Sequence, residues 1–363
     1  MGQGRTNATR LTARREWPLV VRRARPDDEA AVMSFATQTW HGWDYIPRAW
    51  PIWLEADDGV MLVGCRPDGR PIAVSRVALL SPNEGWVEGI RVDPEMRGLD
   101  IASDLQTAEL AWAAAQGVDV VRYATGSDNE ASHRLGARDG FELIAEFKAL
   151  LHSPDPDEEP DGASAYDAEV RATTTRKRQA VLAGLSDQGV VAELDDAEAL
   201  WPLVTRDPTF NAAARQHEAR PWAIQELTED AFAGHLARGE VVVSGTPTDG
   251  MTEWALGIFP GEQPPAEDSA LRLSMLIGDP QRAVELLERG RLLVGESLVV
   301  RVPSPSPLLD DAPDVFAAAG YRSPNWMLHL LGRPLDMDHP APEIDPMRLV
   351  LEDEPAVLAT ARP

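Results

Sequence analysis

The spacing of apolar residues in the first half of the chain alternates between strand-like and helix-like patterns. An apolar stripe of helical period predicts a long helix over residues 102–116, and shorter helices are expected from residue 26 and over 130–139. Apolar runs predict strands at residues 19–23, 60–65, 72–80, 86–92, 118–124 and 141–152. This alternation predicts an α/β fold (α+β mixed), with a mixed, mostly antiparallel sheet flanked by helices.

The second half repeats this order in outline, which predicts a tandem protein. The strand patterns lie at residues 190–191, 241–244, 254–259, 271–277, 298–302 and 327–331, and the helix patterns at 280–293 and 313–319. A Pro-, Asp- and Glu-rich stretch between the halves predicts a linker, with one helix at 174–183. The expected parts are a disordered tail at 1–16, a first domain at 17–153, an acidic linker and connecting helix at 154–188, a second domain at 189–336 and a C-terminal tail at 337–363.

Composition narrows the classes of partner. The chain has 363 residues, enough for two domains, and a formal net charge of −25. That charge argues against a nucleic acid or an anionic membrane as the partner, and no apolar run reaches the length of a membrane span. The single cysteine, Cys65, cannot form an internal disulfide, so we expect a packed strand residue and a cytoplasmic protein.

Residues 97–103 carry the strongest chemical signal. They join a strand to the long helix, and the first amides of a helix have no intrahelical acceptor. These donors and the positive end of the helix dipole favour a phosphate or diphosphate, and Arg97 adds a fixed positive charge.

At this loop the chain resembles the GNAT superfamily of acyl-CoA-dependent N-acetyltransferases. The family pattern Gln/Arg-x-x-Gly-x-Gly/Ala is matched by Arg97-Gly98-Leu99-Asp100-Ile101-Ala102, after Val92-x-Pro94. Asn129 and the pair Gly140-Phe141 follow at the family spacing. The resemblance implies acetyl-CoA as cosubstrate and Asn129 as a contact of the pantetheine arm. The cofactor-binding residues it implies are Ile90, Arg91, Val92, Arg97, Gly98, Leu99, Asp100, Ile101, Ala102, Ser103 and Asn129. The seven histidines and the single cysteine show no metal-binding spacing, so we expect no metal.

Two positions depart from the family pattern. Asp100 stands where the loop usually has glycine, and a carboxylate beside a diphosphate is unfavourable unless it faces solvent or a cation. Gly136 stands where the family often has a general-acid tyrosine. The proton for the departing thiolate is therefore expected from His133, Tyr123 or water.

The second half lacks the Arg-Gly loop and is expected to be a degenerate GNAT-like domain. Its loop reads Gly278-Asp279-Pro280-Gln281-Arg282. The Asp279 carboxylate can cap the following helix, and Pro280 suits the first turn. A capping carboxylate would occupy the amides that a phosphate needs, so we expect this half to lack acyl-CoA.

Three strand and helix residues are the catalytic candidates: Glu88, His133 and Tyr123. Glu88, on the strand before the loop, is the candidate general base, with Glu84 in reserve. The family's oxyanion donor is a backbone N–H, here in the segment from Ile90 to Val92. The alternatives are a solvent-facing Glu88, a surface His133 and an Asn129 that only caps a helix.

The aromatic segment 40–53 is the expected border of the acceptor site. Trp43 and Tyr45 could hold a flat or cationic substrate, and Asp44 could bind an ammonium group. The alternative is that these rings pack the helices against the sheet.

Together these features predict an N-acetyltransferase that moves an acetyl group from acetyl-CoA directly to a small amine or amino-group acceptor in a ternary complex. The expected partner is this small-molecule amine, without nucleic acid or membrane, and the protein is expected to be a monomer or homodimer. A non-catalytic acyl-CoA or small-ligand binding module, or a structural protein, is the alternative.

Overall fold

The computed structural model describes residues 15–37, 44–152, 190–247, 254–260, 271–294, 298–323 and 325–352. The linker expected at 154–188, with its helix, and most of the N-terminal tail therefore lie outside the described residues. The chain divides into two compact units. The first unit comprises residues 1–122, 137–140 and 333–363, and the second comprises 123–136 and 141–332. The predicted domain ranges remain a prediction.

The first unit is built on a mixed sheet. Its strands pair in the order β17, β1, β2, β3, β4 and β5. The outer pairs β1–β17 and β4–β5 are parallel, and the pairs between β1 and β4 are antiparallel. The strands are β1 Leu19–Arg23, β2 Gly59–Cys65, β3 Pro71–Ser81, β4 Glu84–Val92, β5 Val120–Gly126 and β17 Leu349–Leu351. The predicted α/β class with a mixed, mostly antiparallel sheet is confirmed.

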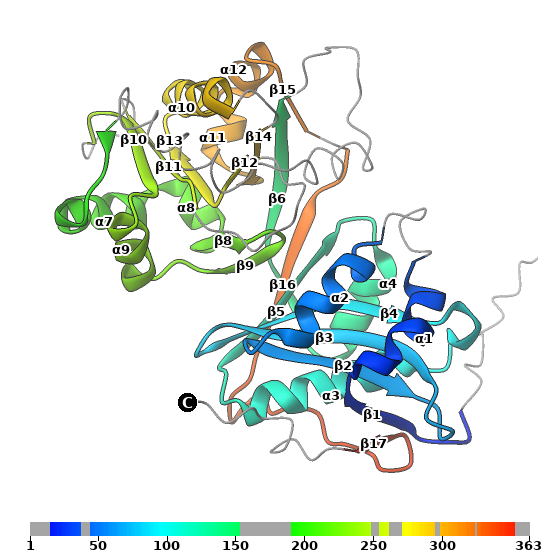
Figure 1. Ribbon diagram of the computed structural model, residues 1–363. Coiled ribbons are helices and arrows are strands. Elements are labelled where there is room, and N and C mark those ends of the chain that lie inside the picture. The colour runs from blue at the N-terminus through cyan, green and yellow to red at the C-terminus, as the bar shows by residue number, and fades with distance from the viewer. Residues whose placement is uncertain are drawn as a thin grey trace, which may run out of the picture. The chain divides into compact units, whose positions relative to one another are not determined.

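Helices cover both faces of this sheet, with α1 and α2 on one face and α3 on the other (Figure 1). They are α1 Glu29–Ala36, α2 Ile46–Glu55 and α3 Ile101–Ala115, the last at the predicted place. The apolar side of α3 buries Leu105 and Trp112, while Trp50 packs from α2 onto strand residues such as Met61 and Val63. This packing holds the β4–α3 loop between two buried elements.

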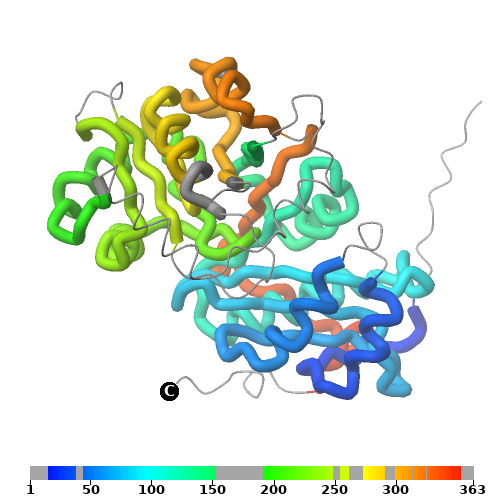
Figure 2. Tube along the Cα trace, turned by 45° about the horizontal axis from the view of Figure 1, so that its top comes forward, coloured from blue at the N-terminus to red at the C-terminus, as the bar shows by residue number. Residues whose placement is uncertain are grey.

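Strand β17, which lies late in the sequence, belongs to the sheet of the first unit. Leu19 to Val21 of β1 pair in parallel with the three residues of β17, and the red C-terminal segment runs beside the blue β1 in Figure 2. The sequence pattern did not predict this strand.

The second unit contains a four-stranded antiparallel sheet, ordered β13, β11, β10 and β7, and a hairpin of β8 and β9. Its further strands pair in the order β12, β14, β6 and β16, with β15 also on β6. The strands are β6 Glu142–His152, β7 Val190–Val191, β8 Gln216–Arg220, β9 Ala223–Glu226, β10 Val241–Gly245, β11 Trp254–Ile258, β12 Leu271–Leu273, β13 Met275–Gly278, β14 Leu298–Pro303, β15 Tyr321–Arg322 and β16 Leu328–Pro334.

The helices of the second unit pack on two apolar clusters. One cluster includes Leu287 of α10 and Phe316 of α12, and the other includes Leu200 of α7 and Phe232 of α9. The helices are α7 Ala197–Arg206, α8 Pro208–Ala212, α9 Glu229–Ala237, α10 Pro280–Val294, α11 Pro307–Asp310 and α12 Pro313–Ala318, and α4 Glu130–Arg138 begins in this unit and ends in the first.

Strand β6 is one continuous strand whose antiparallel partners come from the far part of the chain. Phe147 pairs with Leu328 of β16, and Leu150 pairs with Val300 of β14. The partners of β6 are therefore far from it in the sequence, although they are its neighbours in the sheet. Within the described ranges, no helix is long and apolar enough to cross a membrane.

Candidate functional site

The loop before α3 is bent by two residues with left-handed backbone. Asp93 accepts a hydrogen bond from the Glu95 amide at 3.0 Å and fixes a short turn at the end of β4. Gly98 then has φ +79° and Asp100 has φ +58°. Glycine adopts this region freely, and aspartate is one of the few other residues that tolerate it. The two bends turn the chain into the first turn of α3.

The N-terminus of α3 has no capping side chain. Its N-cap residue, Asp100, makes no side-chain hydrogen bond to the helix, and its carbonyl accepts from the Asp104 amide at 3.0 Å. The side chain of Arg97 is exposed. The predicted loop residues from Arg97 to Ser103 are thus brought together at a helix end whose first amides can donate to an anion.

The corresponding helix of the second half begins differently. Asp279 precedes α10, and its Oδ1 accepts from the Arg282 amide at 3.0 Å. The predicted capping by Asp279 is confirmed. Both helices contain 15 residues, but of the two N-cap carboxylates only that of Asp279, before α10, accepts a hydrogen bond from an amide of the first turn.

The Asp100 carboxylate is held by two arginines instead of capping the helix. Its Oδ1 accepts from Arg138 Nη1 at 3.2 Å, and its Oδ2 lies 3.7 Å from Arg348 Nη2. The sequence placed the Asp100 carboxylate where it would repel a diphosphate, and the structure pairs it with Arg138 and Arg348. Arg348 was missed because it lies near the other end of the chain.

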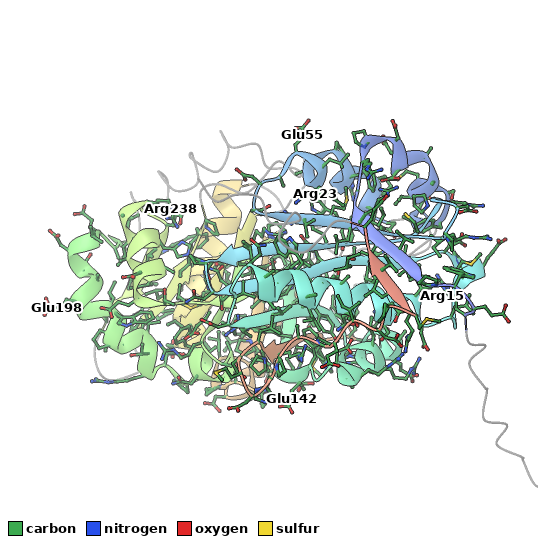
Figure 3. The ribbon with its side chains drawn as sticks, turned by 90° about the horizontal axis from the view of Figure 1, so that it is seen from below. Arg15, Arg23, Glu55, Glu142, Glu198 and Arg238 are labelled. Atoms are coloured by element: carbon green, nitrogen blue, oxygen red, sulfur yellow. The ribbon has the colours of Figure 1, made fainter. Side chains whose placement is uncertain are left out.

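A second network lies behind this loop. Asp104 is buried on the first turn of α3, and its two oxygens accept from Arg348 at 2.7 Å and Arg15 at 2.8 Å. Arg15 also donates to the Leu99 carbonyl at 3.2 Å. Figure 3 labels Arg15 on the segment that leads into β1, beside β17. A cavity of about 240 Å³ adjoins this network and is lined by Ser103, Asp104, Thr107, Arg138, Asp139, Glu343, Asp345, Arg348 and Leu349.

Strand β4 contains a bulge just before the loop. The register shifts between Val74–Arg91 and Arg76–Glu88, so Gly89 and Ile90 both stand opposite Ser75. Gly89 has φ +73°, and a Cβ there would lie 2.6 Å from a ring atom of Trp53. A bulge leaves one residue out of the ladder. This is the segment in which the oxyanion donor was predicted, around Ile90.

The predicted base, Glu88, is not solvent-facing. Its side chain is 13% exposed and forms an ion pair with Arg76. The Arg76 guanidinium is also paired with Asp58 and lies 5.5 Å from the centre of the Trp53 ring. A proton transferred to Glu88 would therefore compete with a buried guanidinium. The reserve candidate, Glu84, is buried at the start of β4 and paired with Arg122.

Three predicted residues form one cluster beside β4. Arg91 Nε donates to Asp44 Oδ2 at 2.7 Å, and its guanidinium lies 5.2 Å from the centre of the Tyr45 ring. The Asp44 side chain is fully enclosed, and its Oδ1 also accepts from the Ile46 amide at 3.0 Å. A substrate ammonium at Asp44 would have to displace Arg91. Trp43 lies outside the described residues.

In the second unit, Asn129 stands immediately before α4. Its Oδ1 accepts from the Ser132 amide at 3.2 Å, and its Nδ2 donates to Thr125 at 2.9 Å. The structure therefore gives Asn129 a capping role, and its contact with pantetheine remains a prediction.

Tyr123 fills the space beside Gly136. The Tyr123 hydroxyl donates to the Ser132 carbonyl at 3.1 Å, and a Cβ at Gly136 would lie 2.1 Å from the hydroxyl oxygen. Its ring packs edge-on against Phe141. Burial raises the pKa of Tyr123 to about 12. The space that a side chain at Gly136 would take is thus occupied by Tyr123 of β5.

His133 lies next to His329, a residue that was not among the candidates predicted from the sequence. The rings of His133 and His329 are 5.0 Å apart, and His329 Nε2 lies 2.8 Å from Glu146 Oε1. His133 Nε2 is 3.3 Å from the Gly126 carbonyl oxygen. Burial lowers the pKa of His329, with the neighbouring His133 acting in the same direction and Glu146 opposing both. His329 and Glu146 stand opposite each other on β16 and β6, a pairing no local pattern reveals.

Cys65 is buried in β2, as expected for a packed strand residue, and burial raises the pKa of its thiol to about 11. Within the described ranges, no group of three or more histidine, cysteine, aspartate or glutamate side chains is arranged to hold a metal ion.

Comparison with known proteins supports the family resemblance that was noted at the β4–α3 loop. Residues 29–141 match the sequence model of the acetyltransferase (GNAT) family. This range includes β4, the loop from Arg97 to Ser103, all of α3 and α4.

Two curated relatives are histidine N-acetyltransferases, from Oreochromis niloticus and Scomber australasicus. They are 29% and 28% identical to this chain over alignments of 133 residues, and each alignment covers 35% of this chain. The chain spans 39% of the length of each relative. Among solved structures, a GCN5-related N-acetyltransferase from Sphaerobacter thermophilus aligns with 91% of this chain and 98% of its own length, at 14% identity and a TM-score of 0.45.

Proposed function

We propose that this protein transfers an acetyl group from acetyl-CoA to a small amine or amino-group acceptor, because residues 29–141 match the model of the GNAT acetyltransferase family. The acyl group passes directly to the amine in a ternary complex. The first half holds acetyl-CoA, and the degenerate second half does not.

The open N-terminus of α3 carries this proposal. Its amides meet no side-chain cap, whereas those of α10 meet the Asp279 carboxylate. The Asp100 carboxylate beside the open end is paired with two guanidinium groups. A diphosphate at α3 would therefore receive amide hydrogen bonds without facing an unpaired Asp100 carboxylate.

The proposed chemistry needs three groups. The acceptor amine loses its proton to Glu88, directly or through water, and attacks the thioester carbonyl. A backbone N–H in the bulge near Ile90 donates to the resulting oxyanion. The thiolate leaves and takes a proton from His133, Tyr123 or water.

The curated relatives supply a starting point for the acceptor. Both carry the name histidine N-acetyltransferase. An α-amino group of a small amino acid is thus the first acceptor to test, with histidine in the panel beside primary amines and polyamines.

A thermal-shift experiment with acetyl-CoA and CoA tests the proposal. A ligand that binds only the folded state raises the melting temperature, by the equivalent of about 2.7 kcal/mol at 100 times its dissociation constant. We expect this shift in the wild type, its loss in Arg97→Glu and its retention in Asp100→Gly. Arg66→Ala, in an exposed turn, is the matched control and keeps the shift. No shift in the wild type refutes the proposal.

A non-catalytic acyl-CoA binding module is the second candidate. Two observations favour the binding module. Gly136 stands where the family often has a tyrosine, and Glu88 forms an ion pair with Arg76. Release of free thiol from acetyl-CoA with the amine panel separates the two. Binding without amine-dependent thiol release supports the module. Release that falls in Glu88→Gln with little change in affinity supports the enzyme.

A further inference from the structure

Asp100 does not behave as an aspartate at a helix start usually does. Such a residue normally has extended backbone and accepts from the amide two or three positions later. Here the left-handed backbone of Asp100 turns the side chain away from that role, and no cap forms. Asp279 shows the ordinary arrangement in the same chain. The Asp100 carboxylate is thus available to partners outside α3.

Those partners come from two other segments of the first unit. Arg138 stands at the end of α4, and Arg348 stands just before β17. Each reaches a different oxygen of Asp100, at 3.2 and 3.7 Å. The carboxylate is therefore held from two sides.

Arg348 is itself fixed in place. Its guanidinium also donates to the buried Asp104 at 2.7 Å, and its amide donates to the Asp345 carbonyl at 2.9 Å. Its carbonyl accepts from the Leu19 amide at 2.7 Å, at the start of the β1–β17 pairing. The pairing of β17 with β1 thus sets where this charge lies.

The acidic side chains near Arg348 make its positive charge important for the loop. The cavity beside the loop carries the acidic side chains of Asp104, Asp139, Glu343 and Asp345, and only two arginines line it. Removing Arg348 would leave Asp100 and Asp104 with less compensation, next to the amides that a diphosphate would need. Like charges that lie a few ångströms apart near a protein surface repel each other, so the lost compensation should weaken the binding of a diphosphate.

We propose that Arg348 is a positioning residue for acyl-CoA: together with Arg138 it holds and neutralises the Asp100 carboxylate, so that the amides of the loop and of α3 can donate hydrogen bonds to a diphosphate. This inference rests on the proposed function and adds a residue from the C-terminal segment to the site.

Calorimetric titration with CoA, on the full chain, tests it. Arg348→Ala is expected to weaken binding about tenfold, and Arg348→Lys less. In Asp100→Gly, binding stays at or above the wild-type affinity. The double variant Arg348→Ala/Asp100→Gly should bind within about threefold of Asp100→Gly, because the charge that Arg348 offsets is gone.

The loss in Arg348→Ala should also shrink at high salt, because salt screens exposed charges. A purely structural role would give neither the rescue by glycine nor this salt dependence. Arg66→Ala is the control and should bind like the wild type, and melting curves without ligand verify that each variant folds.

The outcomes separate the two proposals. If the wild type does not bind CoA, the proposed function fails, and the role of Arg348 fails with it. If the wild type binds and Arg348→Ala binds equally well, only the role of Arg348 is overturned. The same holds if the double variant stays as weak as Arg348→Ala.

Discussion

Glu109 is a carboxyl group in the apolar interior of the first unit. It lies on α3, has no exposed surface and contacts Ser75 of β3. Burial raises its pKa to about 8; Ser75 opposes this shift, and Asp139 adds to it. At neutral pH the side chain is therefore largely protonated, which avoids an unpaired charge in the core.

This residue should make the stability of the protein depend on pH. In the unfolded chain a glutamate ionises near pH 4.5. Because the pKa is raised in the folded state, the stability that Glu109 contributes is fully present below about pH 4.5 and is lost as the pH rises through about 8. Glu109→Gln lacks this titration.

Urea unfolding of both proteins at pH 5 and pH 8.5 measures the effect. The free energy of unfolding of the wild type, taken relative to Glu109→Gln, should fall between the two pH values. Parallel pH profiles would show that Glu109 does not titrate in this range.

At the scale of elements, α4 lies close to Tyr123 of β5 because Gly136 has no side chain. Gly136 lies inside the helix, where replacing glycine by alanine usually stabilises by about 1 kcal/mol. Here the added Cβ would lie 2.1 Å from the Tyr123 hydroxyl and 3.0 Å from the ring carbon that carries it.

We therefore expect Gly136→Ala to lower the melting temperature, opposite to the usual sign. Tyr123→Phe removes the hydroxyl, so adding it to Gly136→Ala should recover part of the loss. Differential scanning calorimetry of the two single variants and the double variant gives the coupling. An increase in melting temperature for Gly136→Ala alone would contradict this packing.

Local patterns were sufficient for several elements. The apolar stripe predicted α3, and Asp279 followed by proline predicted the capped start of α10, because these signals lie within a few residues of each other. The sequence could not place Arg348 against Asp104, since the two are 244 positions apart. It could not bring His329 to His133 either, because β16 reaches that place only through its pairing with β6.

At the scale of the molecule, neither unit is one continuous segment of the chain. The first unit takes β17 from the C-terminal segment, and β6 pairs with β14 and β16 from the second half. A cut after residue 152 would therefore leave both edges of β6 and the outer edge of β1 without these partners.

We expect the fragment 1–152 to fold poorly when produced alone, because unpaired strand edges expose backbone groups and favour aggregation. Circular dichroism and size-exclusion chromatography of the fragment and the full chain measure this. A monomeric fragment with a cooperative thermal transition like that of the full chain would contradict the expectation, and would support the predicted domain at 17–153.

The position of Arg348 also bears on biosynthesis. A ribosome finishes the β4–α3 loop long before it reaches codon 348, so the nascent chain carries Asp100 for most of translation without one of the two guanidinium groups that hold it. Any product that ends before residue 348 would contain the complete loop and still lack the Arg348 guanidinium.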